Sequence, residues 1–585
     1  MTNTDAGETK PLMTTTDAGD TQASMTTTDA GETQPSMTMD EATNAPCPQA
    51  IRTTLAGAAS PVSHSRQGSP ANSVSDPRLA TVISRGADYE RYLAWEDQVA
   101  QAHFCTRPVR LSGRTCRVNR ETGKAKIIYS TASEPDAVLL KACGTRRESL
   151  CKPCSTFYRN DAFALIAAGM AGGKGVPASV ATHPTLFVTL TAPSFGPVHS
   201  TRGAGTNQSC HPRSATETCK HGRSTGCFAH HGPSDSPVGT PICTRCFDYP
   251  RAILFNALAT ELWRRTMIYM ARALGQVTGV GVAEISQHAR LSYVKVAEFQ
   301  KRGLVHLHGV IRVDSSDRGE VRRSRLTIGP DALARAFVTA ARKVTVPYPD
   351  AFRRYGWRVR WGEQIDLAVI SGGEADAMAS RKVAAYCAKY AVKSTHESGA
   401  LDRAVATANL ARLDLSDHFR KLVATALSLG TAEEACGANK KLNLSAWAHT
   451  LGYRGHFLTK SQGYSTTFKH LREERADYVK ATRGIPFVEP DFDPANPSVV
   501  DYGDWSFTGM GYTTSGDAWL AASLYVNKEA MRKASREVLG GEAEGAAEEF
   551  APAEDEGSAE RMVLGGEDEG AAEPMVSAAD LEGVG

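Results

Sequence analysis

The sequence predicts an α+β protein, and segments in the middle of the chain support this prediction. Residues 184–194 (PTLFVTLTAPS) and 292–300 (SYVKVAEFQ) alternate apolar and polar residues with the period of a half-buried strand. Residues 303–313 (GLVHLHGVIRV) form a third strand-like apolar run, and residues 381–395 (RKVAAYCAKYAVKST) are rich in good helix formers. Strands and a helix are therefore expected within one region of the chain.

Both ends of the chain are predicted to be disordered. The first eighty residues contain a twelve-residue repeat (MTNTDAGETKPL, MTTTDAGDTQAS, MTTTDAGETQPS), and a second unit, VLGGEAEGAAEE, recurs near the end as VLGGEDEGAAEP. Such segments bury too little apolar surface to offset the entropy of ordering them. Neither unit resembles a solenoid repeat. We predict disorder over residues 1–80 and an acidic disordered tail over residues 537–585.

The charge of the chain is unevenly distributed. Residues 81–536 carry 61 Lys and Arg against 40 Asp and Glu, whereas the two ends are acidic. A basic body favours a polyanionic partner, and charge alone suits DNA, RNA or an acidic membrane surface. No apolar run approaches eighteen residues, and the polar start lacks a secretory signal. We therefore expect a soluble, cytoplasmic protein with no membrane partner.

The thirteen cysteines of the chain are predicted to bind metal before forming disulfides. Cys151 and Cys154 form a C-x-x-C turn that supplies two zinc ligands, and Cys143 precedes them. The fourth ligand is Cys105 or Cys116, and the preferred set is Cys105, Cys143, Cys151 and Cys154.

A second cysteine-rich stretch offers more candidate ligands than one zinc ion needs. The preferred second set is Cys219, Cys227, Cys243 and Cys246. The further candidates are Cys210, His221, His230 and His231. Both stretches read as zinc-ribbon-like insertions whose metals are structural, because Gly, Ser, Pro and charged residues between the turns form little core. The alternative, reduced buried thiols, accounts for the number of cysteines but not for their spacing.

The third strand-like run carries two histidines two residues apart. His306 and His308 project from one side of a strand because successive side chains alternate. If residues 301–303 (KRG) form a three-residue hairpin loop, Glu298 faces His306. Two imidazoles and a carboxylate suit a divalent metal with room for substrate. The alternatives are core histidines, and a two-residue turn that shifts the register and points Glu298 away.

The predicted helix carries two tyrosines one turn apart. Tyr386 and Tyr390 share a face, with Lys389 and Lys393 beside them. Cations favour phenolate, and a phenolate is a competent nucleophile toward phosphorus. A tyrosine pair at this spacing is otherwise more often a packing feature.

Taken together, FVTLTAPS, VHLHGVIRV and AAYCAKYAVKS resemble, in order, the three motifs of the HUH rolling-circle replication initiators. The closest similarity is to the RepSA family of actinomycete plasmids and integrative elements. That family shares AGGKGVP before the first motif, CTRCFDY at the end of the cysteine-rich stretch, and GYRGHFLTKSQGYSTTF downstream. The resemblance covers roughly residues 100 to 480.

The resemblance implies a nickase that cuts one DNA strand at a plasmid's double-strand origin. Its core is expected to be a five-stranded antiparallel sheet with the histidine strand central and the tyrosine helix alongside. His306 and His308 would bind Mg²⁺ or Mn²⁺, with Glu298 added as third ligand by the register argument. Tyr386 and Tyr390 would be the nucleophiles, assisted by Lys389, leaving a 5′-phosphotyrosine and a free 3′-hydroxyl.

The expected partners and domains follow from these motifs. GMAGGKGVP lacks the Ser or Thr of a P-loop, so a host helicase would unwind the DNA and a host polymerase would extend the 3′ end. The predicted division is a disordered repeat segment at 1–80, a Cys-rich zinc-binding region with a helix at 81–180, an HUH nickase domain at 181–400 with a Cys-rich insertion at 200–250, a helical DNA-binding region at 401–536 and the acidic tail at 537–585.

Two other classes of protein compete with a nickase. An iron oxygenase or cupin-like enzyme uses the same ligand types, but it would need a Glu a few residues after His308, and none is present there. A non-catalytic zinc-ribbon DNA-binding regulator fits the charge and the cysteines. That class does not account for the helix with two tyrosines and lysines.

Overall fold

The computed structural model describes residues 76–201, 209–213, 217–317, 321–356, 358–370, 374–392, 404–436, 441–483 and 489–538. Most of the two predicted disordered segments, 1–80 and 537–585, lies outside the described residues. Their inner edges do not, because α1 (Pro77–Gly86) begins inside the first segment and α10 (Ser515–Val538) ends inside the second. Asp76 caps α1 by accepting a hydrogen bond from the Arg78 N–H at 2.8 Å. This Asp-Pro pair is a helix-start signal, so the ordered part begins earlier than predicted.

The main sheet has five strands in the order β10-β5-β6-β4-β9, and every neighbouring pair is antiparallel. The strands are β4 (Thr185–Leu190), β5 (Arg290–Phe299), β6 (Val305–Asp314), β9 (Ile365–Ile370) and β10 (Leu458–Lys460). Three of them coincide with the strands predicted from sequence. The predicted mixed α+β class, with antiparallel sheets, is confirmed, and the strand with the two histidines lies in the middle.

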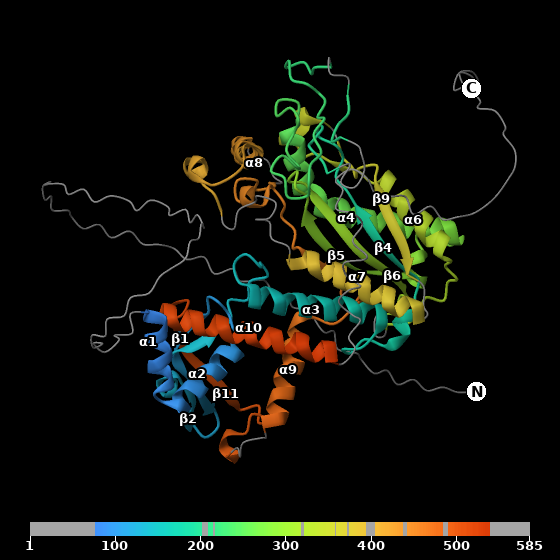
Figure 1. Cartoon of the computed structure of the whole chain (residues 1–585). Helices are drawn as coiled ribbons and strands as arrows, with labels where there is room; N and C mark the ends of the chain where they lie inside the picture. The colour runs from blue at the N-terminus through green and yellow to red at the C-terminus, as the bar shows by residue number, and fades with distance from the viewer. Residues whose placement is uncertain are drawn as a thin grey trace, which may run out of the picture. The chain divides into compact units, whose positions relative to one another are not determined.

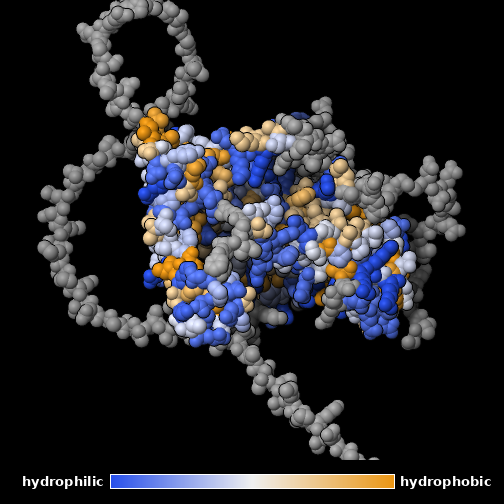
Figure 2. All heavy atoms as spheres, turned by 90° about the horizontal axis from the view of Figure 1, so that it is seen from below, coloured by the Kyte–Doolittle hydropathy of each residue, from blue (hydrophilic) through white to orange (hydrophobic). Residues whose placement is uncertain are grey.

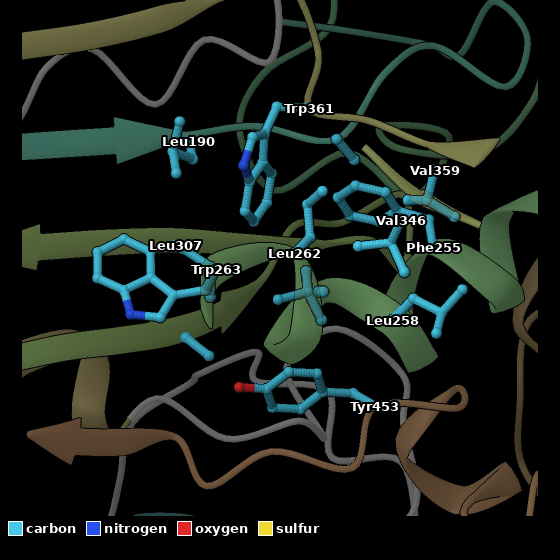
Figure 3. Close-up of a cluster of buried hydrophobic side chains, with 14 of the residues drawn as sticks. Leu190, Phe255, Leu258, Leu262, Trp263, Leu307, Val346, Val359, Trp361 and Tyr453 are labelled. Carbon is cyan, nitrogen blue, oxygen red and sulfur yellow. The ribbon is translucent and has the colours of Figure 1, made fainter. Parts of the chain in front are cut away.

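One face of this sheet is covered by α4 (Tyr249–Thr278) and α6 (Pro330–Lys343), and α8 (Asp417–Ala435) packs against α4. Figure 3 shows part of the core between α4 and the sheet, where Trp263 of α4 lies beside Leu307 of β6. The indole ring of Trp263 packs directly on the backbone of β6 at Gly309. A Cβ at this position would come within 2.6 Å of the ring, so only glycine leaves room for it. The largest hydrophobic cluster of the protein lies on this side.

The opposite face of the sheet is covered by α3 (Lys152–Ala171) and α7 (Glu374–Val392), which pack against each other (Figure 1). Val310 and Phe187 belong to the hydrophobic cluster on this side. Since side chains alternate along β6, His306 and His308 point to this same face. The histidine pair is therefore directed toward the helix that carries the tyrosines.

A second, smaller sheet joins residues from both ends of the described chain. It consists of β1 (Val109–Asn119), β2 (Ala125–Ser130), β3 (Leu139–Lys141) and β11 (Val499–Met510), with β1 pairing to the other three. Trp95 and Val99 of α2 (Tyr89–Gln101) and Ala521 of α10 lie in one small core. Residues 401–536 thus contribute strands to both sheets, β10 and β11, in addition to the helices α8, α9 and α10. These strands form because they pair with strands far away in the sequence, and local residue propensity does not predict such pairing.

The shorter elements connect these layers. They are α5 (Ile285–His288), α9 (Phe468–Arg483), β7 (Val346–Pro347), β8 (Arg358–Val359) and the 3₁₀ turns η1 (Thr131–Ser133), η2 (Ala178–Thr182), η3 (Asp350–Tyr355), η4 (Thr407–Arg412), η5 (Ala448–Thr450) and η6 (Pro490–Phe492). In the face seen in Figure 2, hydrophilic residues predominate and hydrophobic residues gather in small patches. Among the described residues, no helix combines the length and apolar character needed to cross a membrane.

Candidate active site and metal-binding groups

The hairpin formed by β5 and β6 has the register predicted from its three-residue loop. Glu298 pairs with His306 and Phe299 with Val305. The loop closes through the Gly303 N–H, which donates to the Gln300 carbonyl at 2.8 Å, and Gly303 has a φ of 77°. Glycine adopts this left-handed conformation without steric cost. The structure therefore places the Glu298 carboxylate on the histidine face of the sheet.

His308 is held between two polar partners. Its Nδ1 lies 3.1 Å from Thr189 Oγ1 on the neighbouring strand β4, and its Nε2 lies 3.6 Å from Glu298 Oε2 on β5. The imidazole is 3% exposed. The ring of His306 is close by, with ring centroids 4.7 Å apart. Because Thr189 occupies Nδ1, the Nε2 atom is the one directed toward the carboxylate.

The two tyrosines of α7 lie against this histidine. The ring centroid of His308 is 5.0 Å from that of Tyr386 and 5.3 Å from that of Tyr390. The tyrosine rings are 4.6 Å apart, as expected for neighbours one helical turn apart. Ala384 and Ala388 are buried on α7, so the helix backbone can approach its neighbours closely. The structure thus brings the histidine strand and the tyrosine helix together.

Burial dominates the ionisation of the first tyrosine. Desolvation raises the pKa of Tyr386 well above its usual value, and Tyr390 and the Glu298 carboxylate add to the rise. Lys389 is exposed and lies on the outer side, with its Nζ 5.8 Å from the ring centroid of Tyr390. Lys393 lies outside the described residues.

Two polar residues at this face were missed by the sequence argument. Thr189 pairs with His308 on one side and with Asp366 of β9 on the other. Strand pairs share a face, so the Asp366 carboxylate lies on the histidine side of the sheet. Burial raises its pKa, while hydrogen bonding by Gln364 and the charge of His308 oppose the rise. Thr189 lies within a recognised motif, but only the strand order brings Asp366 to the same face.

A buried ionic cluster lies at the C-terminal end of β6. The Arg312 guanidinium donates two hydrogen bonds to the Asp314 carboxylate, at 2.6 and 2.9 Å, and both side chains are fully buried. His183 Nδ1 lies 2.7 Å from the same carboxylate. Arg312 also donates to the carbonyls of Gly169 at the end of α3 and of Gly463. This cluster therefore links β6 to α3 and to the segment after β10.

The first predicted zinc set is assembled as predicted. Cys105, Cys143, Cys151 and Cys154 place their sulfur atoms within 4.8 Å of one another. The Sγ atoms of Cys151 and Cys105 are 3.8 Å apart, which equals the edge of about 3.8 Å of a tetrahedral zinc–sulfur site. Hydrogen bonds from the thiols of Cys105 and Cys154 lower the pKa of Cys151. Cys116 lies elsewhere, on β1, so Cys105 is the fourth member.

The second predicted set is corrected by the structure. Cys219, Cys243 and Cys246 are together, but their fourth member is His221, and Cys227 belongs to a separate group with His199, Cys210 and His231. His221, one of the further candidates, follows Cys219 by two residues, and a Cys and a His at this spacing can share one metal. The backbone N–H of His221 lowers the pKa of Cys219 to about 6.

Among the described residues, three groups bring four Cys or His ligand atoms within 4.8 Å of one another. His306, His308 and Glu298 are not among them. Cys- and His-rich groups of this kind suit a structural metal such as zinc. The fold and these groups together define an α+β protein with several potential metal sites and a buried His–Tyr cluster.

Comparison with known proteins assigns the chain to a family. A family model named RepSA and described as "Replication initiator protein, pSAM2" matches residues 91–525. The chain therefore belongs to the RepSA family of replication initiator proteins. It is 36% identical over 496 residues to a replication initiator protein of Streptomyces ambofaciens, and the match covers 81% of this chain and 98% of that protein. No solved structure matches the chain.

Proposed function

We propose that this protein initiates rolling-circle replication of a plasmid by nicking one strand at the double-strand origin. Family membership supports the role in initiation. The observation that supports the nickase chemistry is the contact of both α7 tyrosines with His308 on the central strand, at ring-centroid distances of 5.0 and 5.3 Å. A strand whose histidines point toward a tyrosine helix on the same face of the sheet is the arrangement expected of an HUH endonuclease.

The proposed reaction is a phosphoryl transfer from DNA to tyrosine. The Oη of Tyr386 or Tyr390 attacks the scissile phosphorus, and the bond from phosphorus to the 3′ oxygen breaks. The phenolic proton is released, and the 3′ oxygen takes up a proton to become a free hydroxyl. The other product is a 5′-phosphotyrosine, whose bond energy is kept for a second transfer. Two hydroxyls one helical turn apart can serve one phosphate in turn.

Two side chains of the histidine face lie close enough to share a divalent cation, since His308 Nε2 and Glu298 Oε2 are 3.6 Å apart. His306, His308 and Glu298 would hold Mg²⁺ or Mn²⁺, with the Glu298 carboxylate as the ligand type that these ions favour and with positions left open for substrate. Thr189 occupies Nδ1 of His308 and leaves Nε2 facing Glu298. When bound, the ion would polarise a non-bridging oxygen of the scissile phosphate. Lys389, exposed beside Tyr390, is placed to attract the DNA backbone.

The partners of the proposed reaction are nucleic acid and host enzymes. Residues 81–536 carry an excess of Lys and Arg, which favours binding of origin DNA. A host helicase would unwind the nicked strand, and a host polymerase would extend the 3′-hydroxyl. Binding of the origin by residues 401–536 stays a prediction.

The tyrosines provide the test. Tyr386→Phe and Tyr390→Phe each remove one hydroxyl, so both variants are expected to fold and to nick supercoiled cognate plasmid with Mn²⁺, unequally. The double variant should form no covalent DNA adduct while still binding origin DNA. Tyr478→Phe is the matched control because Tyr478 is 71% exposed on α9, and it should react like the wild type.

The readout is the protein–DNA adduct, trapped under denaturing conditions and mapped at its DNA end. A double variant that still becomes linked to the 5′ end would place the nucleophile elsewhere. Origin binding without any nicking by the wild-type protein would instead favour a non-catalytic DNA-binding regulator.

A further inference from the structure

Residues 193–248, between β4 and α4, contain two of the three Cys/His groups, and their ligands alternate along the chain. We propose that this segment is a cross-braced module that binds two metal ions interdependently. In chain order the ligand pairs are His199 and Cys210, then Cys219 and His221, then Cys227 and His231, then Cys243 and Cys246. The first and third pairs form one group, and the second and fourth pairs form the other.

The distances in the first of these groups match a tetrahedral zinc site. Bond lengths of 2.0 to 2.3 Å give edges of about 3.3 Å between two nitrogens and about 3.6 Å between nitrogen and sulfur. His199 Nδ1 lies 3.2 Å from His231 Nε2, and Cys227 Sγ lies 3.4 Å from the same nitrogen. Cys210 Sγ lies 3.9 Å from His199 Nδ1. The Ser200 N–H donates to Cys210 Sγ at 3.2 Å, as expected for a thiolate.

The distances in the second group are also close to those of a tetrahedral zinc site, and this group has three sulfur ligands where the first has two. His221 Nδ1 lies 3.3 Å from Cys246 Sγ, 3.8 Å from Cys243 Sγ and 4.0 Å from Cys219 Sγ. A single imidazole nitrogen is therefore surrounded by three sulfurs. The composition is Cys₃His here and Cys₂His₂ in the other group, and both are compositions of structural zinc sites.

The module has little else to hold it together. Among the described residues of 193–248, the buried large apolar side chains other than cysteine are Val238 and Phe247. So few buried side chains cannot offset the ordering of the more than forty described residues of this segment. Because each metal closes loops that contain ligands of the other, loss of either ion releases chain that the remaining site needs. Interleaving therefore predicts that the two ions bind and leave together.

The module is seated on the loop of the histidine hairpin. His199 pairs with residues 239–240, since its N–H donates to the Thr240 carbonyl and its carbonyl accepts from the Gly239 N–H, both at 2.8 Å. Gly239 lies so close to Lys301 that a Cβ would come within 2.5 Å of that residue. Lys301 Nζ donates to the Pro233 carbonyl. The candidate metal ligand His199 is thus hydrogen-bonded to Gly239, and Gly239 contacts Lys301 in the loop that sets the register of Glu298 and His306.

Two consequences follow for the full-length protein. Purified chain should carry three zinc ions, one for each Cys/His group. The two ions of the cross-braced module should also hold the hairpin loop, so their loss should loosen residues 300–304. These properties do not depend on the nickase proposal, because neither is measured through activity.

Metal content of single variants tests the interdependence. Cys210→Ser and Cys243→Ser each remove one ligand from a different group of the module, and each should lower the zinc content from three ions to one. Cys143→Ser, in the group outside the module, should lower it by a single ion. Cys436→Ser is the matched control, because Cys436 is exposed and belongs to none of the groups. Retention of two ions by both module variants would overturn the interdependence.

Two further measurements keep the proposal testable if a variant misfolds. In wild-type protein loaded with cadmium, ¹¹³Cd NMR should give three resonances, for four, three and two thiolate ligands. Wild-type protein with two or fewer ions, or without the two-thiolate resonance, would overturn the new site. Amide hydrogen exchange at residues 300–304 should be at least tenfold faster in Cys210→Ser than in Cys436→Ser. Equal exchange would refute the seating of the hairpin by the module.

Discussion

Replacing Asp314 by Asn should destabilise the protein strongly, although only one atom changes. The carboxylate is fully buried and accepts two hydrogen bonds from Arg312, at 2.6 and 2.9 Å. An amide would place an N–H donor against the guanidinium and would leave its charge uncompensated. Removing one partner of a buried ion pair costs about 3–5 kcal/mol, against a total stability of about 5–15 kcal/mol. The shift in melting temperature per kcal/mol falls as the chain grows longer and is about 1 °C for more than 400 described residues, so the melting temperature should fall by roughly 3–5 °C.

The stability that Asp314→Asn removes should also depend on pH, and it should be smaller at low pH than at neutral pH. Burial alone would raise the pKa of Asp314, but hydrogen bonds from His183 and Arg312 hold it below its usual value. A depressed pKa means that the stabilisation is present above the unfolded-state pKa of about 3.9 and is lost as the pH falls through the lower folded-state value. The difference between wild type and variant should therefore be full at pH 7 and shrink below about pH 4.

The assay is urea unfolding followed by circular dichroism, with melting temperatures measured beside it. The matched control is Asp350→Asn, because Asp350 pairs with Arg353 at 2.6 Å while both side chains are more than half exposed. Such surface pairs contribute about 0–1 kcal/mol. If Asp314→Asn lost no more stability than the control, the buried cluster would not anchor β6 to α3.

Two other substitutions on the main sheet have expected outcomes. Thr189→Val keeps the shape of the side chain but removes the hydroxyl at Nδ1 of His308, so Mn²⁺ affinity measured by calorimetry should fall about 10–100-fold with the melting temperature little changed; unchanged affinity would contradict the positioning role of Thr189. Gly309→Ala should cost about 1–3 kcal/mol in urea unfolding because its Cβ would come within 2.6 Å of the Trp263 ring, whereas Gly86→Ala, with open space around it, should cost nothing.

The hairpin shows how much of the site the sequence could predict. The register of Glu298 against His306 depends on the loop length and on a glycine in the left-handed conformation, and both are local features. Tyr386 and Tyr390 are likewise placed on one face by helical periodicity alone. Local geometry was enough to predict which side chains share a face. It was not enough to predict their ionisation, since the burial that raises the pKa of Tyr386 comes from packing on the sheet.

The cysteine groups show where prediction from spacing fails. In the first stretch, Cys105 and Cys116 are the two candidates for the fourth ligand, and the preferred one, Cys105, joins the group. In the second stretch, Cys227 lies between ligands of the other group in sequence, so linear order suggested a wrong partner. His199 was missed because it has no Cys or His within ten residues on either side. Which ligands share a metal in an interleaved arrangement depends on how the chain folds, and the spacing between two neighbouring ligands does not predict it.

The two faces of the central strand β6 make different demands on alternate residues: one face must carry the histidines, and the other must leave room for α4. On one face of β6, His308 contacts the tyrosines of α7 and Val310 packs in the same hydrophobic cluster as α7, so this face combines polar chemistry with packing. On the other face, Gly309 lies under Trp263 of α4, and a larger residue there would displace the helix or the strand. A shift of the backbone at residue 309 would move the adjacent His308, since the two share a peptide bond. The glycine after the histidine pair is therefore explained by the helix on the opposite face of the sheet, and it bears on the geometry of the histidines that the tyrosines contact.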